Sequence, residues 1–241
     1  PTLAYFLHLL PRPMIGKTFA GDAPMFLLGV LAMGVAVVDV GLHKRLATWL
    51  LGWTRGFFIP VFVLCISMAV VGSFISAHAM CAFMTPVMMA VYFGAVEANR
   101  KEGELVHDPA LAKFLLFTLC YALNVGGVGS PAAGGRNVIM MGFWSEYNVP
   151  MDFFTWMKYG LPMVPILGVM VAFYMMVLFG RKIKTKDLTP GLAAIREETT
   201  KMGKMTYPEY VTFGMLLAIL ILWIVGGEEL GLGGPSLLAL L

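Results

Sequence analysis

The stretch that decides the fold of this 241-residue chain reads Gly-Gly-Val-Gly-Ser-Pro-Ala-Ala-Gly-Gly-Arg-Asn and occupies residues 126–137. Five glycines and a proline within these residues exclude a stable helix interior. Apolar runs flank the stretch, Leu111–Val125 and Val138–Tyr147, and each is shorter than the roughly 20 residues that a spanning helix needs. The sequence therefore predicts one broken helix over residues 111–149 that crosses a membrane once, with an unwound centre near mid-membrane.

The composition of the chain indicates a lipid bilayer as its environment. Hydrophobic residues make up 59% of the chain and charged residues 13%, whereas soluble domains carry about 25% charged residues. On this ground we do not expect a soluble fold, a disordered region or a nucleic-acid binder. Three further runs, Ala23–Leu42, Tyr159–Gly180 and Tyr207–Gly227, are long enough to span. We expect an all-α, multi-pass protein of the cell (inner) membrane, surrounded by lipid.

Residues 57–96 form a second irregular region. They contain no Lys, Arg, Asp or Glu over about 40 residues, roughly twice the length of one span. The middle of the region, Gly72–Ala79, is small and polar and includes His78. This pattern predicts two helices joined by a tight turn. The polar tip favours a re-entrant hairpin, and two full spans remain the alternative.

The basic residues predict the orientation. Three stretches carry thirteen of the 17 Lys and Arg residues: His43–Gly56, Asn99–Lys113 and Arg181–Met205. The positive-inside rule places all three in the cytoplasm, which fits one crossing for the broken helix and one for residues 159–180. Within residues 43–55, Trp49 and Trp53 share a helical face suited to the headgroup zone. We expect a helix lying on the cytoplasmic surface there, with a basic loop as the alternative.

The two irregular regions indicate an internal binding site. Backbone without helical hydrogen bonds is tolerated at membrane depth only where protein encloses it or where it lines a wet cavity. Half-helix N-termini attract anions, and freed carbonyl groups coordinate Na⁺. The alternative is a packing kink, because glycines also let helices approach closely.

Arg136, which lies within the break, favours an anion-binding site over a packing kink. A cation at bilayer depth costs roughly 2.5–3.5 kcal/mol and usually faces a cavity or a partner. Its planar fork suits bidentate binding of a carboxylate or sulfate. A structural pair with an acid such as Asp39, or with backbone carbonyls, is the alternative.

Three motifs resemble the divalent anion/sodium symporter family of the ion transporter superfamily. Gly41–Ala47 is similar to the family's Gly-Leu-x-x-Arg-(Leu/Ile)-Ala at the start of a surface helix. Ser73–Ala79, followed by Met84-Thr85-Pro86, lies where the family has a hairpin tip Ser-Asn-Thr and a Leu-Pro. Asn124–Asn137 resembles Asn-Ile-Gly-Gly-x-x-Thr-x-x-Gly-Thr-x-x-Asn of its broken helix. The segments match in order and spacing from about Asp22 to the end of the chain.

The resemblance implies an elevator-type carrier built from two inverted repeats, usually a homodimer. Residues 1–180 would be the first repeat, residues 181–206 a basic cytoplasmic linker, and residues 207–241 the start of a second repeat. We expect the chain to be a fragment truncated within that second repeat. An enzyme is not expected, because no HExxH or GxSxG motif is present.

The resemblance also implies which residues bind. The substrate-binding candidates are Ser76, Ala77, His78, Ser130, Arg136 and Asn137. Ser76 and the carbonyl groups of Gly127 and Gly129 are the candidates for Na⁺, the coupling ion, and no other cofactor is expected. The family's tip asparagine is Ala77 here and its threonine is His78, so side-chain ligands for Na⁺ are lost while His78 and Arg136 both favour an anion.

The expected function is secondary transport of a small divalent anion, a dicarboxylate or sulfate, coupled to Na⁺. A proton-coupled carrier or exchanger of another branch of the superfamily is one alternative, with His78 as the proton carrier. A non-transporting membrane scaffold or sensor is the other. The cysteines Cys65, Cys81 and Cys120 lie in apolar runs without metal-binding spacing, and we expect them to be small hydrophobic residues rather than a disulfide framework.

Overall fold

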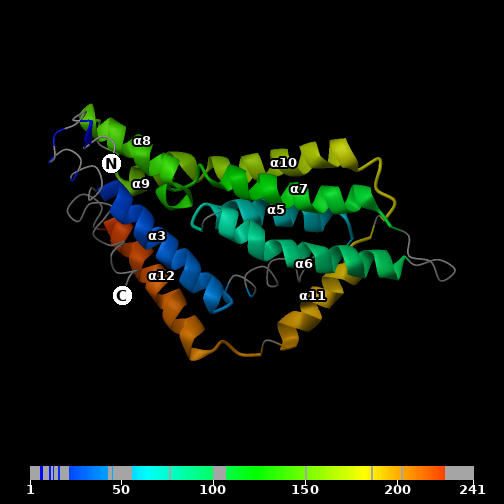
Figure 1. Cartoon of the computed structure of the whole chain (residues 1–241). Helices are drawn as coiled ribbons and strands as arrows, with labels where there is room; N and C mark the ends of the chain where they lie inside the picture. Colours follow the sequence, from blue (N-terminus) through cyan, green and yellow to red (C-terminus); the bar gives the residue numbers. More distant parts are fainter. Residues whose placement is uncertain are drawn as a thin grey trace.

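The described part of the chain is built from helices (Figure 1). A computed structural model describes residues 6–7, 11, 13, 16, 22–42, 45, 56–75, 77–99, 107–149, 151–185, 187–201 and 203–225. The helices are α3 (Asp22–Asp39), α5 (Phe58–Gly72), α6 (Ala77–Ala98), α7 (Pro109–Gly126), the 3-10 turn η1 (Pro131–Ala133), α8 (Gly135–Glu146), α9 (Phe153–Gly160), α10 (Met163–Phe179), α11 (Thr189–Lys201) and α12 (Tyr207–Val225). The expectation of an all-α protein is confirmed for these residues.

Several helices have the length and composition of membrane spans. Met80–Ala98, Pro109–Gly126 and Phe153–Phe179 are long and apolar enough to cross, and the last contains most of the predicted span 159–180. Pro24–Asp39, Phe58–Gly72 and Tyr207–Trp223 are shorter apolar helices within the described residues.

The expectation that the first half of the broken helix is too short to cross is wrong. α7 has 18 residues, because it begins before the apolar run. The Asp108 side chain accepts the Leu111 N–H at the helix start, and Pro109 occupies the first turn, where its missing N–H costs nothing.

The predicted pair of helices within residues 57–96 is present as α5 and α6, joined through residues 73–76. The N–H groups of Ser73 and Phe74 still bond to the carbonyls of Val70 (3.1 Å) and Val71 (3.0 Å), so α5 ends in a tight turn. Whether the pair is re-entrant remains a prediction.

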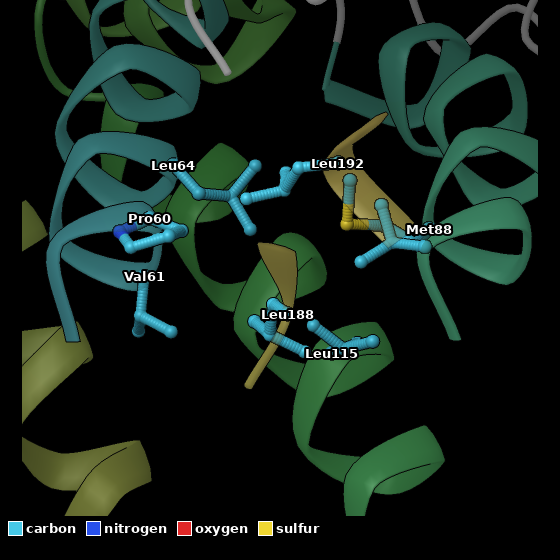
Figure 2. Close-up of a pocket in the computed structure, with 8 residues that line it drawn as sticks. Pro60, Val61, Leu64, Met88, Leu115, Leu188 and Leu192 are labelled. Atoms are coloured by element: carbon cyan, nitrogen blue, oxygen red, sulfur yellow. The ribbon is translucent and has the colours of Figure 1, made fainter. Parts of the chain in front are cut away.

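The pair α5 and α6 shares a large apolar core with α7, α10 and α11. α5, α7 and α10 lie side by side in Figure 1, and α11 lies against α6. Figure 2 shows the side chains that line a void of about 10 Å³ in this core, among them Leu64, Met88 and Leu115. The lining is apolar throughout and the void is at the lower limit for one water, so we expect it to be dry.

A second, smaller core joins segments far apart in the sequence. α3 and α12 lie side by side in Figure 1, and α3 also contacts α8. Phe26 and Phe153 pack on Trp223 with ring centroids 4.9 Å and 4.8 Å away. Ala132 of η1 and Val138 of α8 belong to the same core. The break between α7 and α8 therefore lies at the boundary between the two cores.

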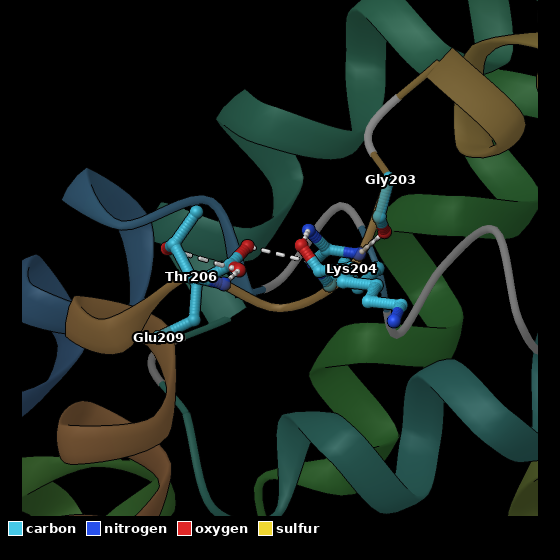
Figure 3. A network of polar contacts seen from close by, with 5 residues as sticks. Gly203, Lys204, Thr206 and Glu209 are labelled. Atoms are coloured by element: carbon cyan, nitrogen blue, oxygen red, sulfur yellow. Dashed lines mark hydrogen bonds and ion pairs between the residues drawn. The ribbon is translucent and has the colours of Figure 1, made fainter.

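The beginning of α12 is fixed by a network of polar contacts (Figure 3). Thr206 donates its N–H to Glu209 Oε2 (2.5 Å), a capping-box contact that satisfies a free donor at the helix start. Glu209 Oε1 pairs with Arg45 Nε at 2.6 Å, and Arg45 also donates to the carbonyls of Gly203 (2.7 Å) and Lys204 (3.0 Å). Arg45 thus holds the connection between α11 and α12. The predicted surface helix 43–55 otherwise lies outside the described residues.

The three basic stretches come together in the structure. Residue 45 binds residues 203–204, as above, and Gly56 donates its N–H to Thr189 Oγ1 at 3.0 Å. Asp108, which is 1% exposed, accepts the N–H groups of Lys184 (2.7 Å) and Thr185 (3.0 Å) in addition to that of Leu111. This proximity supports the prediction that all three stretches share one side of the membrane.

We predict that Asp108→Asn destabilises the protein by about 1–3 kcal/mol. In the wild type the backbone N–H groups donate to the Asp108 carboxylate, whereas the NH₂ of an asparagine would face some of these N–H groups as a second donor. Asp187→Asn is the matched control, since Asp187 is exposed and accepts bonds from Thr189 within its own turn. Thermal unfolding of both variants in detergent measures the difference. Equal unfolding temperatures for the two variants would contradict the anchoring role of Asp108.

Candidate functional site: the helix break and the hairpin turn

The end of the hairpin's first helix and the helix break are joined by hydrogen bonds. Ser73, directly after α5, has its Oγ 3.1 Å from the carbonyl of Ala69 and 3.0 Å from that of Gly126, the last residue of α7. In return, the Ser130 hydroxyl donates to the Ser73 carbonyl and accepts the Ala132 N–H at 3.1 Å. Ser73 and Ser130 are fully buried. The two irregular regions that the sequence singled out are therefore one continuous structure.

The carbonyl groups at the end of α7 accept hydrogen bonds from three different elements. The Gly126 carbonyl faces Ser73, as described. The Gly127 carbonyl accepts the Asn137 Nδ2 of α8 at 2.6 Å, and the same Nδ2 lies 2.8 Å from the Ser130 carbonyl. The Val128 carbonyl accepts the indole N–H of Trp156 of α9 at 2.9 Å. The Gly127 and Val128 carbonyls, which a continuous helix would have satisfied internally, are thus satisfied by side chains, whereas the Gly126 carbonyl also accepts the Gly129 N–H at 2.9 Å.

Two of the glycines in the break are required by close packing. A Cβ at Gly126 would overlap the carbonyl oxygen of Ala69, and a Cβ at Gly129 would overlap the side chains of Ser73 and Val164. These contacts explain how the backbone of the break comes near enough to α5 for the hydroxyls of Ser73 and Ser130 to reach across.

Arg136 lies over the break and has no partner among the described residues. It is the second residue of α8 and is exposed. Its Nη2 would lie 2.7 Å from a Cβ placed on Gly127, so the guanidinium reaches back to the end of α7. The structure shows no ion pair or hydrogen bond between Arg136 and any described residue, Asp39 included. The guanidinium is therefore available to an anion at a helix N-terminus, where the helix dipole also favours negative charge.

The other predicted site residues are placed as follows. Ser130 and Asn137 are buried and meet at the break. Ala77 and His78 begin α6, Ala77 half-buried and His78 exposed, whereas Ser76 lies outside the described residues. No described contact joins His78 to Arg136, so the sharing of one ligand by these two residues remains a prediction.

Sequence reasoning missed the roles of Ser73 and Trp156. Ser73 belongs to the tip motif Ser73–Ala79, but Ser76 is the serine that matches the family pattern and was therefore assigned to the site. The rings of Trp156 and Trp144 lie tilted against each other with centroids 5.8 Å apart, and both line a hollow of about 400 Å³ beside the break, together with Val128, Met151, Tyr159 and Gly160. No spacing signal in the sequence relates these residues.

A broken helix packed among apolar helices long enough to span a membrane, with a guanidinium beside it that has no partner among the described residues, is typical of an integral, multi-pass membrane protein of the transporter class. The model of the citrate transporter family matches residues 2–240, so the chain belongs to this family.

Curated relatives of the chain are named as sodium-dependent dicarboxylate transporters, which confirms the expected resemblance. The sodium-dependent dicarboxylate transporter SdcS of Staphylococcus saprophyticus is 27% identical over 225 residues, covering 90% of this chain and 42% of the relative. The sodium-dependent high-affinity dicarboxylate transporter 3 of Caenorhabditis elegans is 24% identical over 225 residues, covering 86% of this chain and 38% of the relative. The chain thus spans about two fifths of the length of these relatives.

We predict that Gly126→Ala destabilises the protein by about 1–3 kcal/mol, because the new methyl group must displace the Ala69 carbonyl and separate the break from α5. Gly142→Ala in α8 is the matched control: a Cβ there meets nothing within 4 Å, and the substitution is expected to stabilise by about 0.4–1 kcal/mol. Unfolding temperatures of the purified variants measure both effects. A Gly126→Ala protein as stable as Gly142→Ala would show that the close approach is not needed.

Proposed function

We propose that this protein is a secondary active transporter of small dicarboxylates, coupled to Na⁺. The observation that carries the proposal is the exposed guanidinium of Arg136, which lies over the helix break without a described partner. A carboxylate bound there would receive two parallel charge-assisted hydrogen bonds. The names of the relatives support a dicarboxylate as substrate and Na⁺ as coupling ion. Sulfate is an additional candidate, because two of its oxygens can accept the same pair of guanidinium hydrogen bonds.

The substrate would lie between the hairpin turn and the break. Arg136 would bind one carboxylate from the side of α8, and Ser76, Ala77 and His78 would line the opposite side. Ser130 and Asn137, which are buried and hydrogen-bonded to backbone carbonyls, would hold the backbone of the break in place.

Na⁺ would bind through backbone oxygens rather than side chains. The Gly127 carbonyl accepts one bond from Asn137 and keeps a second lone pair for a cation. Gly129 and Ser76 remain the other candidate ligands. Because the tip lacks the family's asparagine, the side-chain contribution to this site is small.

The remaining parts of the proposal come from the family resemblance. Residues 1–180 would form the first of two inverted repeats, residues 181–206 the cytoplasmic linker, and residues 207–241 the start of the second repeat. The carrier would work as a homodimer by an elevator movement.

Uptake of radiolabelled succinate into proteoliposomes containing the full-length protein tests the function. We expect uptake that requires an inward Na⁺ gradient and that unlabelled succinate and sulfate reduce by competition. Uptake driven by a proton gradient alone would favour the proton-coupled alternative and contradict Na⁺ coupling. Succinate binding without uptake would favour a scaffold or sensor.

We predict that Arg136→Ala weakens the apparent affinity for succinate about tenfold to a hundredfold, the loss of about 1.5–3 kcal/mol expected for a charge-assisted hydrogen-bonded contact. Arg136→Lys keeps the charge but loses the bidentate fork, so it should lie between Arg136→Ala and wild type. Arg181→Ala, an exposed arginine beyond the end of α10, is the control and should leave the affinity unchanged. Unchanged KM for uptake in both Arg136 variants would remove Arg136 from the substrate site.

A further inference from the structure

Two cysteines from neighbouring helices meet beside the candidate site. Cys81 lies on α6, three residues after His78, and Cys120 lies on α7, six residues before the break begins at Gly126. Their sulfur atoms are 3.3 Å apart, close enough for an S–H···S contact. The third cysteine, Cys65, is fully buried on α5. No local pattern relates Cys81 to Cys120, because 39 residues separate them.

We propose that Cys81 and Cys120 form a reversible disulfide bond that inhibits the carrier under oxidising conditions. A disulfide needs the sulfurs at about 2.05 Å, so they must approach each other by little more than 1 Å from their present contact. Both side chains are half-buried, which admits a small oxidant to the pair, whereas Cys65 is enclosed.

The oxidant would be a small peroxide, and the reaction balances in two steps. The sulfur of one thiol attacks a peroxide oxygen, the O–O bond breaks, and the proton of the thiol goes to the leaving hydroxide, so that the products are a sulfenic acid and water. The second thiol then displaces the hydroxyl group of the sulfenic acid, which forms the S–S bond and releases a second water. Two electrons pass from the sulfurs to the peroxide, and a dithiol reductant reverses the change.

The position of the pair explains why the bond would inhibit transport. The hairpin turn and the break are already joined by the hydrogen bonds of Ser73 and Ser130. In the proposed carrier, a substrate entering between them would move α6 relative to α7, and the hydrogen bonds of Ser73 and Ser130 can yield to such a movement. A covalent bond between Cys81, one helical turn from His78, and Cys120, less than two turns from Gly126, would prevent this movement. The inhibition depends on the proposed function, but formation of the bond does not.

The first measurement detects the bond itself. The full-length protein in membranes is treated with hydrogen peroxide, alkylated after denaturation, digested and analysed by mass spectrometry. We expect a linked pair of peptides containing Cys81 and Cys120, with Cys65 alkylated, and no such link in Cys81→Ser or Cys120→Ser. If both cysteines remain free after peroxide and after the membrane-permeant oxidant diamide, the proposal is wrong.

The second measurement tests the inhibition. Succinate uptake by the wild type should fall severalfold after peroxide treatment and return after dithiothreitol. Cys65→Ser, the matched control, should behave like the wild type, whereas Cys81→Ser and Cys120→Ser should be insensitive to peroxide. A linked peptide pair without loss of uptake would overturn the inhibition. Absence of uptake in the reduced wild type would contradict the proposed function and leave the peptide result as an independent test of the bond.

Discussion

A helix that is interrupted among apolar helices must find hydrogen-bond donors for the carbonyl groups that the interruption sets free. Lipid offers none, and each unsatisfied group costs several kcal/mol. In this protein the side-chain donors come from three places, the Ser73 hydroxyl after α5, the Asn137 amide in α8 and the Trp156 indole in α9, and the Gly126 carbonyl also accepts the Gly129 N–H. Because each donor belongs to a different element, satisfying the break also fixes how those elements lie around it.

This arrangement determines the electrostatic character of the break. Its carbonyl oxygens, which attract cations, are largely engaged by side chains, whereas the guanidinium of Arg136 has no described partner. The N-terminus of α8 adds a partial positive charge at the same place. The guanidinium and the helix N-terminus support the proposed anion site, as does a tip that carries His78 where the related family has a threonine, and the second lone pair of the Gly127 carbonyl supports the proposed Na⁺ site.

The sequence predicted the helical parts of the fold well because membrane helices are long apolar runs and glycine-rich breaks are conspicuous within them. The break at residues 126–137 and the paired helices of residues 57–96 were both found in this way. Helix ends were less predictable, since α7 depends on the cap at Asp108, whose carboxylate also binds residues 184–185. Arg45 was recognised as part of a motif, but its partner Glu209 lies 164 residues away, and no local pattern relates the two.

By itself, the sequence determined that this chain lies in a membrane, where its helices are interrupted, and that a cation is present at the main interruption, because hydropathy and glycine content act locally. Only the tertiary structure decided which groups satisfy the break, that Ser73 and Ser130 join the hairpin to it, and that Cys81 touches Cys120. These contacts depend on the packing of helices against one another. Such packing is set by the close approach of backbones at positions such as Gly126 and not by the pattern within any one helix.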